Sequence, residues 1–397
     1  MPGSDASTRV PDGARVKTEE TQMKKLGVVL CGAGFGSAFL PIYRDHPDVK
    51  FVGLFDTDAE KMKQAASHLG LTRLYGSYRE VLSDPEVDAV HIVTPIPLHE
   101  EQAVLALESG RHCASTVPMS MTIDGIRAIV KAQKASGKTY MLMETTLYTR
   151  QFLNAWGLYA SGKLGRIQLL RGCHYQDMEN WPEYWMGLPP MYYATHAMSP
   201  IARLAGARIE RVVCYGSGQM RPDLRCRYGN PFPAETALLR FENGLAAEVT
   251  RTLFETARAY LEGFNAYGSR ASLEWGFRDA DDLIMTRLES ADHRGFGTPV
   301  QTLRSPAVYK NLPEPIRRYT LAAGSYDETQ PEKSLSEGAA GGHHGSHPHL
   351  VHEFVRSILE EREPAIGLEF ACNVSAAGIL AHASALAGGK EIEIPRF

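Results

Sequence analysis

Tyr193 and His196, three residues apart in the segment YYATHAMSP, are side chains that can move protons on a hydroxylated substrate. A histidine changes its charge near pH 7 and therefore acts as an acid or a base. A tyrosine acts as a base only where positive charge or hydrogen bonds lower its pKa from about 10. Both side chains share one face if the segment is a helical turn. Because Pro200 cannot donate a hydrogen bond to the carbonyl of His196, we expect that turn to end or kink there.

A glycine-rich segment, GAGFGS, indicates a nucleotide site near the start of the chain. Gly32 permits a tight turn, and Gly34 lets the backbone approach a pyrophosphate at a helix N-terminus. Asp56 ends the next apolar run, 24 residues after Gly32. Its carboxylate accepts hydrogen bonds from ribose hydroxyls and repels a 2′-phosphate, which favours NAD over NADP. We assign the whole turn to cofactor binding: Gly32, Gly34, Phe35, Gly36 and Ser37. A glycine turn without a cofactor is the alternative.

Two kinds of pattern surround these residues. Buried apolar runs alternate with helical stretches in the first part of the chain, at residues 24–34, 49–56, 88–95, 111–116 and 139–144. This alternation predicts a doubly wound parallel sheet of the Rossmann type. After residue 150 the strands lengthen and partly alternate in polarity, which predicts an open, largely antiparallel sheet in a C-terminal α/β domain. We expect a disordered tail at 1–23, a Rossmann domain at 24–149 and a substrate-binding and oligomerisation domain at 150–397.

Composition excludes several classes of function. The chain has 397 residues, 44% of them hydrophobic, and a net charge of −4, so no basic field for nucleic acid is expected. No apolar run approaches the roughly 20 residues of a membrane span, and the first 23 residues lack the apolar core of a signal peptide. We therefore expect a cytoplasmic protein with a small-molecule substrate. The scattered cysteines contain no CxxC and are expected to be buried thiols.

A cluster of histidines near the C-terminus also raises the question of a metal site. Its members are His343, His344, His347, His349 and His352. They lack cysteine neighbours and a fixed tetrahedral spacing, and adjacent glycines indicate a loop. We expect no metal and predict that His343 borders the substrate.

Three segments, TPIPLH, SGRHCASTVP and SGKLGRIQ, make the chain from Lys24 onward resemble the Gfo/Idh/MocA oxidoreductases. The resemblance implies a Rossmann domain joined to an open-faced α/β domain, NAD as cofactor, and a homodimer or homotetramer. Dehydrogenases of this family carry Glu-Lys-Pro, with a catalytic lysine, where this chain has Thr116, Val117 and Pro118. We assign to the cofactor site, besides the glycine turn and Asp56, the residues Thr94, His99, Thr116, Val117, Pro118 and Glu144.

A second departure points to a subgroup. Tyr192 and Ser199 replace the aspartates of the dehydrogenase motif Asp-x-Gly-x-His-x-x-Asp, whereas Tyr-x-Thr-His-x-x-x-Pro resembles NAD-dependent glycosidases such as α-N-acetylgalactosaminidases. MLMETTLY and GGHHGSHPHL are similar to further segments of that subgroup. The resemblance implies that transient oxidation at C3 of a sugar acidifies the C2 proton, so that the C1 substituent is eliminated before water addition and re-reduction. It assigns the C3 hydroxyl to His196 and C2 to Tyr193, and suggests His174 as a further acid or base.

The substrate is less defined by the sequence. A small imported glycoside is expected, and sulfoquinovosides fit if Arg150 or Arg171 binds the sulfonate. Trp185 is a candidate for stacking on the sugar. Solvated arginines, a packed tryptophan, a structural carboxylate at Glu144 and structural roles for Tyr193, His196 and His174 are the alternatives. An NAD-dependent sugar or cyclitol dehydrogenase with His196 as base is the competing function, and a cofactor-binding protein without turnover is a third.

Overall fold

The computed structural model describes residues 24–225, 227–258, 260–276, 278, 281–288, 298–320 and 342–397. The predicted N-terminal tail lies outside these residues, as do Cys226 and most of the polar stretch before His343. In the part of the chain that is described, no helix is long and apolar enough to cross a membrane.

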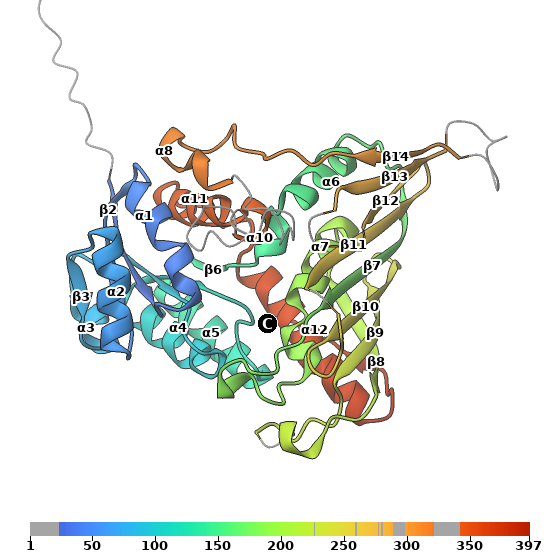
Figure 1. Ribbon diagram of the computed structural model, residues 1–397, viewed down its shortest axis with the longest axis horizontal. Coiled ribbons are helices and arrows are strands. Elements are labelled where there is room, and N and C mark those ends of the chain that lie inside the picture. The colour runs from blue at the N-terminus through green and yellow to red at the C-terminus, as the bar shows by residue number, and fades with distance from the viewer. Residues whose placement is uncertain are drawn as a thin grey trace, which may run out of the picture.

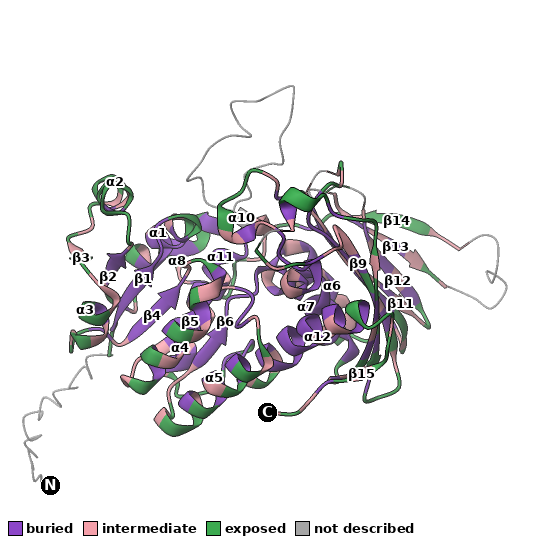
Figure 2. Cartoon of the chain, turned by 90° about the horizontal axis from the view of Figure 1, so that it is seen from below, coloured by how far each residue is buried: buried purple, intermediate pink, exposed green. Residues whose placement is uncertain are grey.

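The first sheet, whose edge strand β3 lies at the left of Figure 1, has six parallel strands in the order β3-β2-β1-β4-β5-β6. Its strands are β1 Leu26–Cys31, β2 Val49–Phe55, β3 Arg73–Tyr75, β4 Ala89–Ile92, β5 His112–Ser115 and β6 Tyr140–Leu142. Every residue of β1 and β4 is buried, because helices cover both faces of the sheet (Figure 2). The five predicted strands and the parallel sheet are confirmed. The short edge strand β3 was not predicted, since only Tyr75 in it is buried.

The helices of this half begin where side chains can satisfy their free amides. Asp58 accepts hydrogen bonds from the amides of Glu60 and Lys61 at the start of α2, and Thr122 caps α5 through the amide of Gly125. The elements are η1 Phe35–Ala38, α1 Leu40–Asp45, α2 Ala59–Leu69, α3 Tyr78–Ser83, η2 Ile96–Leu98, α4 His99–Glu108, α5 Ile123–Ser136 and η3 Thr145–Tyr148.

The second sheet has nine strands in the order β14-β13-β12-β11-β7-β10-β9-β8-β15. They are β7 Ile167–Tyr175, β8 Ile209–Ser217, β9 Ala234–Phe241, β10 Ala246–Thr252, β11 Leu261–Gly268, β12 Ala271–Trp275, β13 Leu283–Arg287, β14 Val300–Leu303 and β15 Ile392–Glu393. Only β7 and β10 pair in parallel, so the predicted, largely antiparallel sheet is confirmed. Burial alternates along β9, which means that one face packs inward and the other faces solvent.

Helix α7 (Thr195–Ala205) lies directly against the inner face of β7. A Cβ at Gly172 of β7 would lie 2.1 Å from the carbonyl oxygen of Ala197, so only glycine allows this approach. Of the two outcomes predicted at Pro200, an end of the helical segment is wrong, because α7 continues to Ala205, and a kink stays a prediction. Pro200 removes one hydrogen bond, and burial of almost every residue of the helix compensates for that loss.

The remaining helices are α6 Arg150–Ala160, η4 Glu183–Trp185, η5 Pro190–Tyr193, η6 Pro222–Leu224, α8 Glu314–Arg317, η8 Arg318–Thr320, α10 Gly342–Gly345, α11 His347–Leu359 and α12 Leu368–Leu386. The last two return to the first sheet. His352 Nδ1 lies 3.0 Å from Nε2 of His46, and the amide of Leu142 donates to the carbonyl of Ile366. The C-terminal segment therefore contacts both sheets, and the domain limits at residues 149 and 150 stay a prediction.

Candidate active site

A cavity of about 660 Å³ lies where the two sheets meet. Phe35, Thr94, Thr116 and Met143, which all follow strands of the first sheet, line one side. The opposite side comes from β7, the segment 176–193, the start of α7, and His343. Ligands of doubly wound sheets bind at the carboxyl ends of the strands, which is where this cavity lies.

The glycine turn has the shape that a dinucleotide requires. Gly32 has a φ of +107°, and a Cβ there would lie 2.4 Å from the carbonyl oxygen of Val93. A Cβ at Gly36 would lie 2.4 Å from the side chain of Leu30, so Gly36 permits close packing of helix on strand. Gly34 is exposed, and the Nζ of Lys61 would lie 3.4 Å from a Cβ built on it. An exposed backbone beside a lysine fits a pyrophosphate.

Asp56 stands beside this turn as predicted from the sequence. Its two oxygens accept hydrogen bonds from the amides of Ala33, at 2.6 Å, and Asp58, at 2.8 Å. These bonds hold a carboxylate at the end of β2, where the ribose of NAD is expected. Thr94, His99, Thr116 and Val117 line the cavity nearby. His99 also lies 2.8 Å from each of two carbonyl oxygens, those of Thr94 and Pro118, and so joins two loops of the site.

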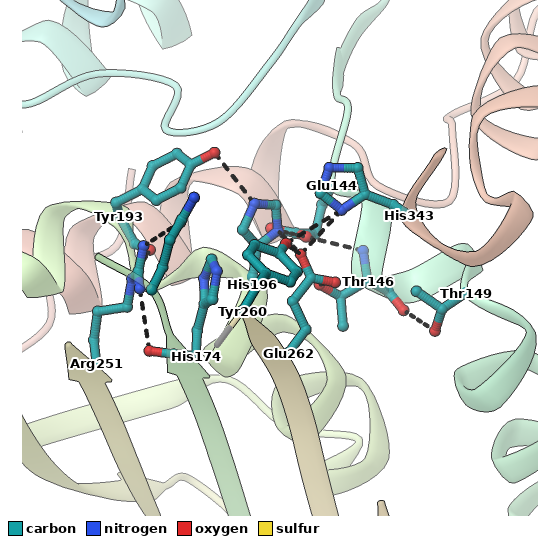
Figure 3. A network of polar contacts seen from close by, with 11 residues as sticks. Glu144, Thr146, Thr149, His174, Tyr193, His196, Arg251, Tyr260, Glu262 and His343 are labelled. Carbon is teal, nitrogen blue, oxygen red and sulfur yellow. Dashed lines mark hydrogen bonds and ion pairs between the residues drawn. The ribbon is translucent and has the colours of Figure 1, made fainter. Parts of the chain in front are cut away.

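His196 is the centre of the acid–base groups (Figure 3). Its Nδ1 lies 2.5 Å from Oε1 of Glu144, which comes directly after β6. Because a carboxylate only accepts hydrogen bonds, Nδ1 carries the proton and Nε2 is left with a lone pair. Nε2 lies 3.4 Å from the hydroxyl of Tyr193. Tyr193 and His196, which were predicted to act together, are therefore in contact, and the lone pair on Nε2 allows His196 to act as a base.

Charge also adjusts the pKa of His196. Burial alone lowers this pKa, but the nearby carboxylates of Glu144 and Glu262 outweigh burial, and the pKa lies above its ordinary value. Glu144 itself does not line the cavity, because its side chain is fully buried behind His196. Its contact with His196 indicates a positioning role, and its predicted role in cofactor binding stays a prediction.

We expect Glu144→Gln to move the acid limb of the kcat/KM profile downward by about 1 pH unit. A base must be neutral to act, so the raised pKa of His196 places this limb above the pH of an ordinary histidine. Removing the carboxylate lowers that pKa and populates the base at lower pH. The pH dependence of kcat/KM measures the shift. Glu248→Gln, on the outer face of the second sheet, is the control, and an unchanged limb in Glu144→Gln would contradict the role.

A second acid–base group was missed by the sequence analysis. Glu262 on β11 is fully buried, and its Oε1 accepts hydrogen bonds from Tyr260 and from Nδ1 of His343, the latter at 3.1 Å. Burial alone raises the pKa of Glu262, but His196 and His343 outweigh it and hold this pKa well below its usual range. A glutamate inside the apolar strand segment YLEGF was the one available signal. His343, which was predicted to border the substrate, does line the cavity.

Arg251 on β10 was also missed. It is fully buried and donates to the carbonyl oxygens of His174 and Tyr193, each at 3.1 Å, and to the side chain of Gln176. These acceptors are neutral, so its charge is not cancelled by a bonded carboxylate among them. Burial lowers the pKa of Arg251 to about 10, which leaves it charged at neutral pH. Its guanidinium lies 5.4 Å from the ring of Tyr193.

The charge of Arg251 acts on the hydroxyl of Tyr193. Burial raises the pKa of this tyrosine, and Arg251 opposes that rise. Arg251 does not cancel that rise, and the pKa of Tyr193 stays above its ordinary value, with Glu144 and Glu262 raising it further.

Several buried polar atoms that face the cavity have no hydrogen-bond partner among the described residues. They are both ring nitrogens of His174, Oγ1 of Thr145 and Nε1 of Trp185. Burial and Arg251 hold the pKa of His174 well below its ordinary value, so this residue is neutral. Because buried polar groups in native proteins are normally bonded, these atoms are available to bond a polar group in the cavity.

The two predicted sulfonate ligands do not reach the cavity. Arg171 alternates with the buried residues of β7, so it points to the outer face and pairs with Glu248 at 2.7 Å. Arg150 begins α6 and does not line the cavity. Trp185, by contrast, is part of the cavity wall, as predicted.

The predicted histidine cluster separates in the fold. His347 packs its ring 4.2 Å from that of Phe39, and His349 lies 2.7 Å from the carbonyl of Val308. Only His343 of the five lines the cavity. Among the residues described, no three histidine, cysteine, aspartate or glutamate side chains are arranged to hold a metal ion.

Comparisons with known proteins agree with the cofactor site. Residues 26–144 match the model of an oxidoreductase family with an NAD-binding Rossmann fold, GFO_IDH_MocA. A glycosyl hydrolase family 109 protein of Porphyromonas gingivalis is 25% identical over 76% of this chain and 71% of its own length. Levoglucosan dehydrogenase of Pseudarthrobacter phenanthrenivorans is 26% identical over 70% of this chain and 80% of its own.

Other matches are shorter or show the fold alone. The match to 1-carboxy-3-chloro-3,4-dihydroxycyclohexa-1,5-diene dehydrogenase of Comamonas testosteroni, at 27% identity, spans 57% of each chain. The match to an uncharacterized oxidoreductase of Rhizobium meliloti spans 44% of that protein. Among solved structures, levoglucosan dehydrogenase in complex with NADH and L-sorbose has a TM-score of 0.75 at 22% identity and covers 94% of this chain and 100% of that chain.

Proposed function

We propose that this chain, whose residues 26–144 match the model of an oxidoreductase family with an NAD-binding Rossmann fold, is an NAD-dependent glycoside hydrolase of the Gfo/Idh/MocA superfamily. The observation that supports this most is the meeting of two histidine–glutamate pairs at one cavity: His196 with Glu144, and His343 with Glu262. Oxidation of an alcohol requires one base. Elimination of a C1 substituent requires a further base at C2 and an acid at the leaving oxygen.

The cofactor, held by the glycine turn and Asp56, supplies a reversible two-electron oxidation of the C3 alcohol to a ketone. Nε2 of His196 takes the C3 hydroxyl proton and later returns it. Glu144 stabilises the imidazolium that forms in between, because it bonds to the opposite ring nitrogen. His196 thus ends each cycle in the protonation state in which it began.

Tyr193 takes the C2 proton once C3 is a ketone. The charge of Arg251 favours its phenolate, against burial and the carboxylates of Glu144 and Glu262, which together keep the pKa of Tyr193 above its ordinary value. His343, bonded to Glu262, donates a proton to the leaving oxygen. Because the pKa of His174 lies well below its ordinary value, its ring is neutral and lacks the second proton that an acid would donate. We therefore assign its two ring nitrogens to hydrogen bonds with substrate hydroxyls, in place of the predicted acid–base role.

A neutral sugar is the substrate we propose. The described residues that line the cavity include no lysine or arginine, so a sulfonate has no charged partner among them. The sulfoquinovoside expectation therefore finds no support in Arg150 or Arg171. A hydrolysis assay that compares sulfoquinovosides with neutral glycosides tests this choice.

Hydrolysis in D₂O tests the mechanism. Removal and return of the C2 proton are expected to place deuterium at C2 of the product, as measured by NMR, with no net accumulation of NADH. A hydrolysis product that keeps its C2 proton throughout would overturn the proposal.

The competing function is an NAD-dependent sugar or cyclitol dehydrogenase. His196 with Glu144 suffices for alcohol oxidation, and levoglucosan dehydrogenase is among the relatives. Formation of one NADH for each sugar oxidised, without release of an aglycone, would support that function instead.

We also propose that the chain forms a homo-oligomer through the outer face of the second sheet. Three large apolar side chains are exposed on that face: Leu169 on β7, Leu238 on β9 and Tyr215 on β8. Exposed apolar side chains on a sheet face favour association. Molar mass in solution, measured by light scattering, tests this.

A further inference from the structure

We infer that the outer end of the cavity binds an aromatic aglycone, so that the substrate is an aryl glycoside. This inference rests on the proposed function, because it identifies the group attached at C1. It is carried by the side chains of the segment 178–185, which line the cavity beyond the acid–base groups.

A series of aromatic rings leads from the acid–base centre to the surface. The ring of Trp185 lies 4.8 Å from that of Tyr193, nearly perpendicular at 84°. Trp181 lies 5.9 Å from Trp185, again edge to face, and Tyr184 lies 5.5 Å from it. Trp181 is 47% exposed, although it lines the cavity. The series therefore ends in an aromatic face that a ligand can cover.

Trp185 is held in a packed core, and the half-exposed Trp181 lies edge to face against it. Trp185 packs in a small core of its own with Met178, Leu188 and Phe254, separate from the main core. The amide of Trp181 donates to the carbonyl of Met178. A rigid aromatic surface binds a flat ligand without a further loss of side-chain freedom.

The cavity changes in chemical character from its inner to its outer end. The inner end has the unpartnered nitrogens of His174 and the hydroxyl of Thr145. The other end, where Trp181 is exposed, has Trp181 and Tyr184, and the described residues that line the cavity include no lysine, arginine, aspartate or glutamate. A ligand that matches both ends has a hydroxylated ring inside and an uncharged aromatic group outside.

The chemistry of an aryl glycoside suits this site. In the elimination, the C2–H electron pair forms the C1–C2 double bond, and the C1–O bond breaks with its pair on the aglycone oxygen. A phenol oxygen, with a pKa near 10, carries that charge more readily than an alkyl oxygen does. His343 then supplies the proton that completes the released phenol.

Calorimetric binding of C-glycosides tests the inference without any cleavage. Phenyl and methyl C-glycosides of glucose, galactose and N-acetylgalactosamine are titrated as pairs into protein saturated with NADH, so that no oxidation begins. We expect the phenyl member of at least one pair to bind about tenfold more tightly than its methyl partner. In Trp181→Ala this ratio is expected to fall to about twofold or less.

Tyr309→Ala is the matched control, because Tyr309 is similarly exposed but does not line the cavity. It is expected to keep the wild-type ratio, and Trp181→Phe to keep most of it. The inference is overturned if no phenyl member binds more tightly than its partner, or if Trp181→Ala weakens both members equally, as stacking on the sugar would. Tight binding of phenyl glycosides without hydrolysis would overturn the proposed function and leave the aromatic site standing.

Discussion

His196→Asn is expected to lower kcat/KM for the best glycoside by about 10² to 10⁴-fold, the usual range for loss of a general base. The amide cannot accept the C3 proton, so the first step of the cycle fails while binding of NAD remains. None of the hydrogen bonds made by the ring of His196, including the one to Glu144, is to a residue of the glycine turn. The dissociation constant for NAD should therefore stay close to that of the wild type. Rapid-quench measurement of the first turnover and NAD titration check both expectations.

His349→Asn is the control for this substitution. It changes a histidine of the same C-terminal cluster whose Nε2 lies 2.7 Å from the carbonyl of Val308, outside the cavity. We expect near-normal turnover from it. Equal activity of the His196→Asn and His349→Asn variants would contradict the role of His196 as the general base.

Arg251→Met is expected to reduce the free energy of unfolding by roughly 3 kcal/mol or more and to abolish most activity. The substitution leaves buried carbonyl oxygens of His174 and Tyr193 without their donor. It also removes the positive charge that opposes the rise in the pKa of Tyr193. The limb of the pH profile that requires the tyrosinate is therefore expected to move to higher pH. Denaturant unfolding and pH-dependent turnover measure the two effects.

Two further variants separate charge from packing. Arg251→Lys keeps the charge but loses the planar set of donors, so it should recover activity more than stability. Arg171→Met removes a half-exposed arginine from the neighbouring strand, where its pair with Glu248 is solvated, and should cost about 1 kcal/mol or less. Arg251→Met that unfolds no more easily than Arg171→Met would contradict the account.

The sequence predicted those parts of the site that are close together along the chain. Gly32 and the turn after it follow one strand, and Asp56 ends the next, so strand and turn patterns were enough. Tyr193 and His196 are three residues apart, and any compact backbone brings them together. The strands of the first sheet were recognised because burial on both faces makes them uniformly apolar.

The rest of the site depends on pairings between distant strands. Glu144 and His196 are separated by 52 positions, and Glu262 and His343 by 81. No local pattern encodes such contacts. Arg171 and Arg251 illustrate the same limit, because both lie in strands. Which of them is buried depends on which set of alternating side chains in each strand faces the core, and the sequence does not show this. The sequence therefore placed Glu144 at the correct edge of the sheet but did not predict its contact with His196.

Gly172 sets how closely α7 approaches β7 at this site. The carbonyl of Ala197, one residue after His196, occupies the space that a side chain on β7 would fill. The separation between a histidine on the helix and a histidine on the strand, 5.1 Å between the rings of His196 and His174, is thus fixed by direct backbone contact. A methyl group there would push the helix and the strand apart, and with them His196, the proposed base, and His174, which is proposed to bond substrate hydroxyls.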